Sequence, residues 1–182
     1  MKDGNIIQNV AVYLGSADVH NQVFRQAVVD LANFLADHNM TLVFGGSNSG
    51  MMKLLADTML ARNGKVIGIF TKSLPEKFIR HDLTESVITE NLAERKAEML
   101  NRADAVIALP GSIGTFDELF DALAQKKLGA VSCPIGVLNI DGFFDPLFEL
   151  LKKSKEVGFT SQKAFAMLHC GRTPEELFEN FQ

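Results

Sequence analysis

Short apolar runs alternate with helix-like segments along most of this chain. The runs at residues 10–14 and 105–109 contain no charged residue, and turn-forming residues follow both. A strand that is apolar on both faces must be covered on both faces, and strands that alternate with helices pair in parallel. The pattern therefore predicts an α/β fold: a single-domain, Rossmann-like three-layer sandwich with a parallel sheet, over residues 1–182.

The order of the predicted elements follows from this alternation. Strands are predicted at residues 10–14, 41–44, 65–70, 86–89, 105–109 and 134–140. Helices are predicted where apolar residues recur every three or four positions, at residues 23–39, 51–63, 92–102, 115–128 and 143–157. A last helix begins at Thr173 and Pro174, which combine an N-cap residue with proline at the first helical position. No linker or repeat interrupts the series, which indicates one domain.

Charge and cysteine content limit the partners and the compartment. The formal net charge is −4 over 182 residues, and polymeric nucleic-acid binders need a basic field, so a nucleic acid is not expected as a partner. The spacing of Cys133 and Cys170 fits neither a metal site nor a disulfide framework, which favours reduced thiols in the cytosol. Residues 1–5 show no secretory pattern, and no apolar stretch reaches the roughly 20 residues that span a bilayer. We expect a cytoplasmic protein without a membrane partner.

Three loops rich in small residues follow predicted strands, at residues 15–17, 45–50 and 110–115. Ligands of open parallel sheets bind at this edge, where glycine allows close approach and a helix N-terminus offers free N–H groups to a phosphate. The alternative is that the glycines only make tight turns, but three such loops at one edge favour a cradle for a phosphorylated nucleotide. The residues expected to form it are Gly15, Ser16, Gly45, Gly46, Gly111, Ser112, Ile113, Gly114 and Thr115.

Two charged residues stand close to these loops in the predicted fold. Arg95 lies at the edge of the apolar stripe of its helix, so its guanidinium needs an anionic partner. A phosphate fits this need, and the alternative is an internal salt bridge. Glu118 shares a helix face with Thr115 and is expected near a bound sugar, although it could simply complement the helix dipole. The neighbouring Asp117 and Asp121 have the pattern of a solvated face.

Several common site patterns are missing from the sequence. No loop has the Gly-Lys-Ser/Thr of a P-loop, and none has the full Gly-x-Gly-x-x-Gly of a dinucleotide dehydrogenase. No serine sits in a nucleophile elbow. The histidines form no helix-spaced pair, so no metal site is predicted. The histidines in question are His20, His38, His81 and His169.

At these residues the chain resembles the LONELY GUY family of nucleoside-5′-monophosphate phosphoribohydrolases, which are often labelled lysine decarboxylases. The family motif Pro-Gly-Gly-x-Gly-Thr-x-x-Glu is similar to residues 110–118, with Ser112 in place of the second glycine. The family Arg-Lys pair matches Arg95 and Lys96, and the likeness continues through residues 45–52 and 139–144. It runs over nearly the whole chain in the right order.

The resemblance implies hydrolysis of the N-glycosidic bond of AMP or of a cytokinin riboside monophosphate. It implies Arg95 and Glu118 as catalytic residues, Lys96 as a substrate-binding residue beside them, and the cradle residues as phosphate ligands. It also implies a homodimer and no metal or organic cofactor, whereas a lysine decarboxylase would need pyridoxal phosphate on a lysine, for which no motif is present.

The chain departs from the family pattern at several positions. Lys77 stands where the family has a glutamate, and Leu92-Ala93 stands where it has Met-His. Ala124 and Gln125 fall in a stretch where the family has Thr-Trp-x-Gln-Leu-Gly. These positions help to shape the base and sugar pocket or the subunit contact. They leave two alternatives open: a nucleotide-binding or sensing protein without turnover, and a phosphoribohydrolase for another base.

Overall fold

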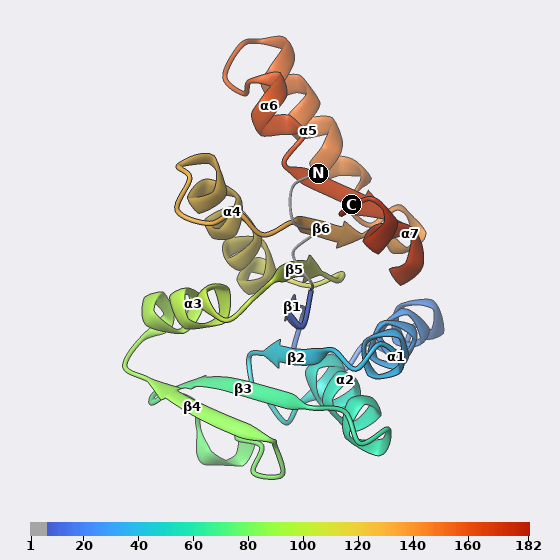
Figure 1. The fold of residues 1–182 in the computed structure, drawn as a ribbon, viewed down its shortest axis with the longest axis vertical. Coiled ribbons are helices and arrows are strands. Elements are labelled where there is room, and N and C mark those ends of the chain that lie inside the picture. Colours follow the sequence, from blue (N-terminus) through green and yellow to red (C-terminus); the bar gives the residue numbers. More distant parts are fainter. Residues whose placement is uncertain (1–6) are drawn as a thin grey trace.

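A single parallel sheet of seven strands forms the centre of the protein (Figure 1). The computed structural model describes residues 7–182. The predicted domain over residues 1–182 and the prediction that residues 1–5 show no secretory pattern also concern residues 1–6, which lie outside the described residues. The strand order is β4-β3-β2-β1-β5-β6-β7, and every neighbouring pair is parallel, as predicted. The strands are β1 (Asn9–Tyr13), β2 (Thr41–Phe44), β3 (Val66–Thr71), β4 (Glu85–Thr89), β5 (Ala105–Ala108), β6 (Ile135–Leu138) and β7 (Leu168–Gly171).

Helices cover both faces of this sheet. They are α1 (Gln22–Asp37), α2 (Gly50–Ala61), α3 (Leu92–Asn101), α4 (Ile113–Lys127), α5 (Asp145–Glu156), α6 (Gln162–Phe165) and α7 (Pro174–Glu179), with short 3₁₀ turns η1 (Glu76–Phe78) and η2 (Ile140–Gly142). In Figure 1, α3 and α4 lie on one side of the sheet, and α1, α2 and α7 lie on the other. Within residues 7–182, no helix is long and apolar enough to cross a membrane.

The two cores follow from the alternation of side chains along each strand. Val10 and Val12 of β1 point into the core beneath α1 and α2, where Leu31 and Leu55 are fully buried. The intervening Ala11 belongs to the opposite core, beneath α3 and α4. Because the central strands β1, β2 and β5 are buried on both faces, they are hydrophobic at every buried position. This arrangement confirms the predicted three-layer α/β sandwich.

The structure differs from the predicted elements mainly toward the C-terminal end. The strand β7 was not predicted, because its four residues Leu168–Gly171 are too short and too polar to show a strand pattern. The predicted strand at residues 134–140 ends at Leu138, since the chain turns through η2 with Asp141 in the left-handed region (φ 52°). The helix predicted from residue 143 therefore begins at Asp145.

The chain reverses its direction across the sheet between β1 and β5. From β1 the chain winds outward through β2 and β3 to the edge strand β4, and α3 then carries it back to β5 on the other side of β1. The loops after β1 and β5 consequently diverge toward opposite faces. Such a switch point leaves a crevice at the carboxyl ends of the strands, where ligands of doubly wound sheets bind.

Truncating a core leucine tests this packing. Leu31 is 0% exposed on α1, whereas Leu150 of α5 is 62% exposed. Leu31→Ala should lower the free energy of unfolding by about 2–5 kcal/mol, because it removes buried methyl groups and leaves a cavity. The matched Leu150→Ala should change it by no more than about 0.5 kcal/mol. Urea unfolding of both variants measures the difference, and equal effects would contradict the assigned core.

Candidate active site

The three glycine-rich loops converge at the switch point. A Cβ atom on Gly15, after β1, would lie 3.5 Å from the Cα atom of Gly111, after β5, so the two loops lie side by side with room for about one side-chain atom between them. The backbone N–H of Met51 donates to the carbonyl oxygen of Ala17 at 3.1 Å, which joins the second loop to the first. A cavity of about 290 Å³ opens here. Its lining includes Gly15, Phe24, Met51, Gly111, Ser112 and Phe143.

The N-terminus of α4 is open toward this crevice. Its N-cap residue Ser112 makes no side-chain hydrogen bond to the helix, whereas Asn21 and Asn91 cap α1 and α3 in this way. The side chain of Ile113 is 80% exposed, and a Cβ atom on Gly114 would meet nothing within 4 Å. The first turn of α4 therefore presents backbone N–H groups without a side-chain cap, which is the arrangement that binds anions.

The turn before α4 depends on the glycine at position 111. A Cβ atom there would overlap the side chain of Thr115, which is buried beneath the loop. The hydroxyl-bearing side chain of Thr115 thus occupies the space that any residue other than glycine would need. This close approach holds the loop down against the first turn of α4.

Arg95 and Glu118 form a buried ion pair. Nη1 of Arg95 donates to Oε1 of Glu118 at 2.7 Å, and the two side chains are 13% and 7% exposed. Nε of Arg95 also donates to the carbonyl oxygen of Ile69 in β3 at 3.0 Å. An internal salt bridge of Arg95 was the alternative to a bound phosphate in the sequence analysis. That salt bridge is present, and its carboxylate belongs to Glu118, the other residue predicted to be catalytic.

Burial controls the electrostatics of this pair. It raises the pKa of Glu118 above the ordinary value of a glutamate, although the neighbouring Arg95 charge acts in the opposite direction. Tyr13 of β1 lies in the same environment, and its pKa is raised by burial and by the charge of Glu118. The carboxyl of Glu118 is consequently more basic than a solvated glutamate, which is a common property of groups that exchange protons in active sites.

The loop after β2 packs directly on the guanidinium of Arg95. A Cβ atom on Gly45 would overlap Nη2 of Arg95, and a Cβ atom on Gly46 would overlap the ring of Phe70. Gly46 also has a φ of 71°, which favours glycine. The structure therefore brings Gly45, Gly46 and Arg95 together, and it links them through the loop of Ala17 to Gly15 and Ser16.

Lys96 is held by carboxylates of α4. Its Nζ donates to Asp117 at 3.0 Å and lies 3.8 Å from Asp121, and the hydrogen bond to Asp117 raises the pKa of Lys96. Asp117 and Asp121 were predicted as a solvated face, and Asp117 is exposed as predicted. The sequence did not reveal that they bind Lys96, which joins α3 to α4 next to the buried pair.

Three residues that depart from the family pattern lie on different parts of the surface. Lys77 is exposed in η1, with its ammonium 4.9 Å from the ring centre of Phe78. Gln125 donates to Asp121 at 2.9 Å, on the same carboxylate that faces Lys96. Ala124 lines a groove of about 240 Å³ between α4 and the α5–α6 region. None of the three lines the cavity at the switch point.

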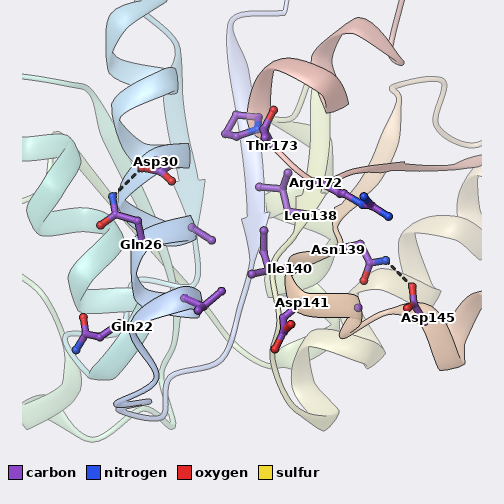
Figure 2. Close-up of a pocket in the computed structure, with 14 residues that line it drawn as sticks. Gln22, Gln26, Asp30, Leu138, Asn139, Ile140, Asp141, Asp145, Arg172 and Thr173 are labelled. Carbon is purple, nitrogen blue, oxygen red and sulfur yellow. Dashed lines mark hydrogen bonds between the residues drawn. The ribbon is translucent and has the colours of Figure 1, made fainter.

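A larger cleft of about 830 Å³ lies elsewhere, between α1 and the ends of β6 and β7 (Figure 2). Gln26 donates to Asp30 at 2.8 Å on one wall, and Asn139 donates to Asp145 at 2.7 Å on the other. No residue predicted for catalysis or substrate binding lines it. The sequence analysis missed this cleft, although the motif at residues 139–144 supplies one of its walls.

An uncapped helix N-terminus beside a buried carboxylate–guanidinium pair can hold an anion and place charge next to it. Within residues 7–182, no group of three or more His, Cys, Asp or Glu side chains is arranged to hold a metal ion. The fold and the site together define a Rossmann-like protein with an uncapped helix N-terminus at its switch point; Arg95 and Glu118 do not line the cavity there.

Comparisons with known proteins identify the family. A sequence model described as "possible lysine decarboxylase" matches residues 52–181. The cytokinin riboside 5′-monophosphate phosphoribohydrolase LOG2 of Arabidopsis thaliana is 36% identical over 158 residues, covering 86% of this chain and 74% of its own. The probable enzyme LOGL2 of Oryza sativa subsp. japonica is 34% identical, covering 96% and 72%. The chain therefore belongs to the LONELY GUY family, as the motifs predicted.

Solved structures share the fold. The X-ray structure of protein TM1055 superposes with a TM-score of 0.71 at 24% identity, covering 94% of this chain and 96% of that one. The molybdenum cofactor binding protein of Rippkaea orientalis gives 0.70 at 21% identity, covering 97% and 96%. These likenesses show the fold alone, so the site must carry the functional argument.

The raised pKa of Glu118 makes stability depend on pH in a definite direction. Because the folded state holds this proton more tightly than the unfolded chain does, the stabilisation is complete at low pH and is lost as pH rises through the folded pKa. Relative to Glu118→Gln, the wild type should therefore lose unfolding free energy as pH rises above the ordinary glutamate pKa and through the raised pKa of the folded state. Urea unfolding of both proteins across this range measures it. A difference that grows in favour of the wild type would mean that pairing with Arg95 outweighs burial.

Proposed function

We propose that this chain hydrolyses the N-glycosidic bond of a nucleoside 5′-monophosphate, AMP or a cytokinin riboside monophosphate, to the free base and ribose 5-phosphate. The observation that carries the proposal is the Arg95–Glu118 ion pair, 2.7 Å apart, which joins α3 to α4, the helix whose uncapped N-terminus faces the switch point. The relatives named as cytokinin riboside 5′-monophosphate phosphoribohydrolases, at 34–36% identity, support the same activity.

The chemistry requires a charge beside the ribose. As the bond to the base breaks, positive charge develops at C1′ and the ring oxygen, and a carboxylate stabilises that charge. Water adds its oxygen to C1′ and gives up one proton, and the leaving base gains one proton, so the two products form without any other reactant. Glu118 serves as the carboxylate that stabilises the charge or accepts the proton from water. Arg95 orients the nucleotide and keeps Glu118 close to the reacting centre.

The phosphate is proposed to bind on the first turn of α4. Backbone N–H groups of the turn formed by Gly111, Ser112, Ile113, Gly114 and Thr115 act as donors, and Lys96 adds positive charge from α3. The loops of Gly15-Ser16 and Gly45-Gly46 complete the walls. This hydrolysis needs only water as co-reactant, so we propose no metal or organic cofactor.

The chain is not assigned as a lysine decarboxylase. The family description says only "possible", whereas the curated relatives bear the names of phosphoribohydrolases. Decarboxylation of lysine would also require a cofactor bound to a lysine side chain. Lys96, next to the proposed site, is bound to Asp117 instead.

Release of free adenine from AMP tests the activity. The wild type should release it, and Glu118→Gln should lower kcat by at least about 100-fold, since an amide cannot take up the proton or carry the negative charge. Asp30→Asn, which changes an exposed carboxylate in the larger cleft, is the control and should retain full activity. Chromatography of the products gives both results.

The outcome also separates the alternatives. Measurable binding of AMP without release of adenine would favour a nucleotide-binding or sensing protein, the reading that the substitutions at Lys77, Ala124 and Gln125 suggest. A panel of other nucleoside monophosphates, pyrimidines included, identifies a preference for another base. Activity with none of them would overturn the proposed hydrolysis.

We further propose that the protein is a homodimer built on α4. Along this helix Ile113, Phe120 and Leu128 are 80%, 42% and 84% exposed, and their spacing of seven and eight residues places them on one side. An exposed apolar stripe of this kind favours a subunit contact. Phe120 also borders the apolar groove in front of α5 and α6.

A charge on this stripe should separate the subunits. Phe120→Glu is expected to sediment as a monomer, because the interface would bury an unpaired carboxylate. Val23→Glu places the same charge at a half-exposed position of α1, on the opposite layer, and should leave the dimer intact. Sedimentation velocity measures both. A wild type that sediments at the monomer mass of 20.0 kDa would rule out the dimer.

The compartment is likewise a proposal. Cys133 and Cys170 are both unpaired in the structure. Unpaired, partly buried cysteines are typical of a reducing environment, which supports the cytoplasm as the place where this protein acts.

A further inference from the structure

The connection between β3 and β4, residues 72–84, lies against the glycine-rich loop after β2. The backbone N–H of Asn48 donates to the carbonyl oxygen of Phe78 at 2.8 Å. Next to this bond, Ser47 and Ile79 form an isolated antiparallel bridge, and Ser47 is 8% exposed. The connection therefore covers the loop whose first glycine, Gly45, packs on the guanidinium of Arg95.

One buried side chain fastens this connection to the rest of the protein. Arg80 is 7% exposed and donates to Asp82 through Nε at 2.6 Å and through Nη2 at 2.8 Å. Its Nη1 donates to Asp57 of α2 at 2.5 Å and reaches the carbonyl oxygen of Lys53 at 3.5 Å. A planar guanidinium can hold two carboxylates in this way, whereas an ammonium cannot.

The carboxylates around Arg80 are set to stay ionised. The hydrogen bond from Arg80 lowers the pKa of Asp82, in spite of partial desolvation. Burial alone would raise the pKa of Asp57, but the hydrogen bonds from Lys53 and Arg80 outweigh it and lower the pKa. Because both carboxylates stay charged, their ion pairs with Arg80 persist at neutral pH.

We propose that Arg80 is a positioning residue: by tying the β3–β4 connection to α2, it presses the loop of Gly45 to Ser47 against Arg95 and so fixes the guanidinium toward Glu118. The chain of contacts runs from Asp57 through Arg80 and Ile79 to Ser47, and from the neighbouring Gly45 to Arg95. This role rests on the proposed hydrolysis, since it concerns how the same site is held in place.

The expected effect is on the chemical step more than on binding. Arg80 lies behind the loop, away from the uncapped turn of α4 that is proposed to hold the phosphate. Loosening the loop shifts Arg95 relative to Glu118, and small displacements of catalytic groups lower rates by about 10- to 100-fold. Arg80→Lys keeps the charge but loses the paired hydrogen bonds.

Kinetics with AMP test this role. Arg80→Lys should lower kcat by about tenfold or more while KM changes by less than about threefold. Asp57→Asn should act in the same direction, and the double variant should be no worse than Arg80→Lys, because both break one linkage. Arg62→Lys is the matched control: Arg62 pairs with Asp37 at the surface, close to the end of α2, and its change should leave kcat unaltered.

A second readout does not depend on activity. The amide of Asn48, which donates to Phe78, should exchange with solvent at least about tenfold faster in Arg80→Lys and at the wild-type rate in Arg62→Lys. If the wild type shows no hydrolysis, the proposed function fails, and the exchange rate still tests the linkage. An unchanged kcat in folded Arg80→Lys, or unchanged exchange at Asn48, would overturn the role of Arg80.

Discussion

The guanidinium of Arg95 is buried at the edge of the sheet, and a buried charge is tolerated only beside an opposite charge and with its N–H groups satisfied. Glu118 supplies the opposite charge, with its carboxylate 2.7 Å from Nη1 of Arg95, and the carbonyl oxygen of Ile69 accepts from Nε at 3.0 Å. These two contacts of Arg95 join α3, α4 and β3 at one point. The arrangement of the loops around the switch point follows from the need to enclose this pair.

The pair is also an electrostatic compromise that suits catalysis. Desolvation raises the pKa of Glu118, and the Arg95 charge opposes that effect. Lys96 is kept near by Asp117, so positive charge surrounds the carboxyl without neutralising it completely. A carboxyl in this state can carry a charge or a proton, depending on what is bound. The helix α4 thus takes part in two proposed contacts: its N-terminus faces the proposed phosphate, and its exposed apolar side faces the proposed partner subunit.

The sequence predicted the parts of the structure that rest on local patterns. The buried residues of strands such as β1 and β5 are hydrophobic on both faces of the sheet, and this makes the strands easy to recognise. The four-residue β7 carries His169 and Cys170 and has no such pattern, so it was missed. Arg95 and Glu118 were singled out because helix spacing places them at the edge of a stripe and beside a glycine turn.

Contacts between distant segments were beyond the reach of these patterns. The direct bond between Arg95 and Glu118 joins residues 23 positions apart, and the sequence favoured a phosphate over a carboxylate as the partner of Arg95. Arg80 was not recognised at all, since its partner Asp57 lies 23 positions away on another element. Lys96 was expected next to the ligand, and only the structure shows the carboxylates that bind it.

No space is left for a side chain at Gly45, Gly46 or Gly111. The volume that a methyl group would take up at each belongs already to the side chain of Arg95, Phe70 or Thr115. The backbone of these loops therefore packs closely on the neighbouring side chains at this edge of the sheet. A larger residue at any of the three glycines would displace the side chain that it meets, so the tolerance of these loops to mutation depends on side chains outside the loops as well as on Thr115.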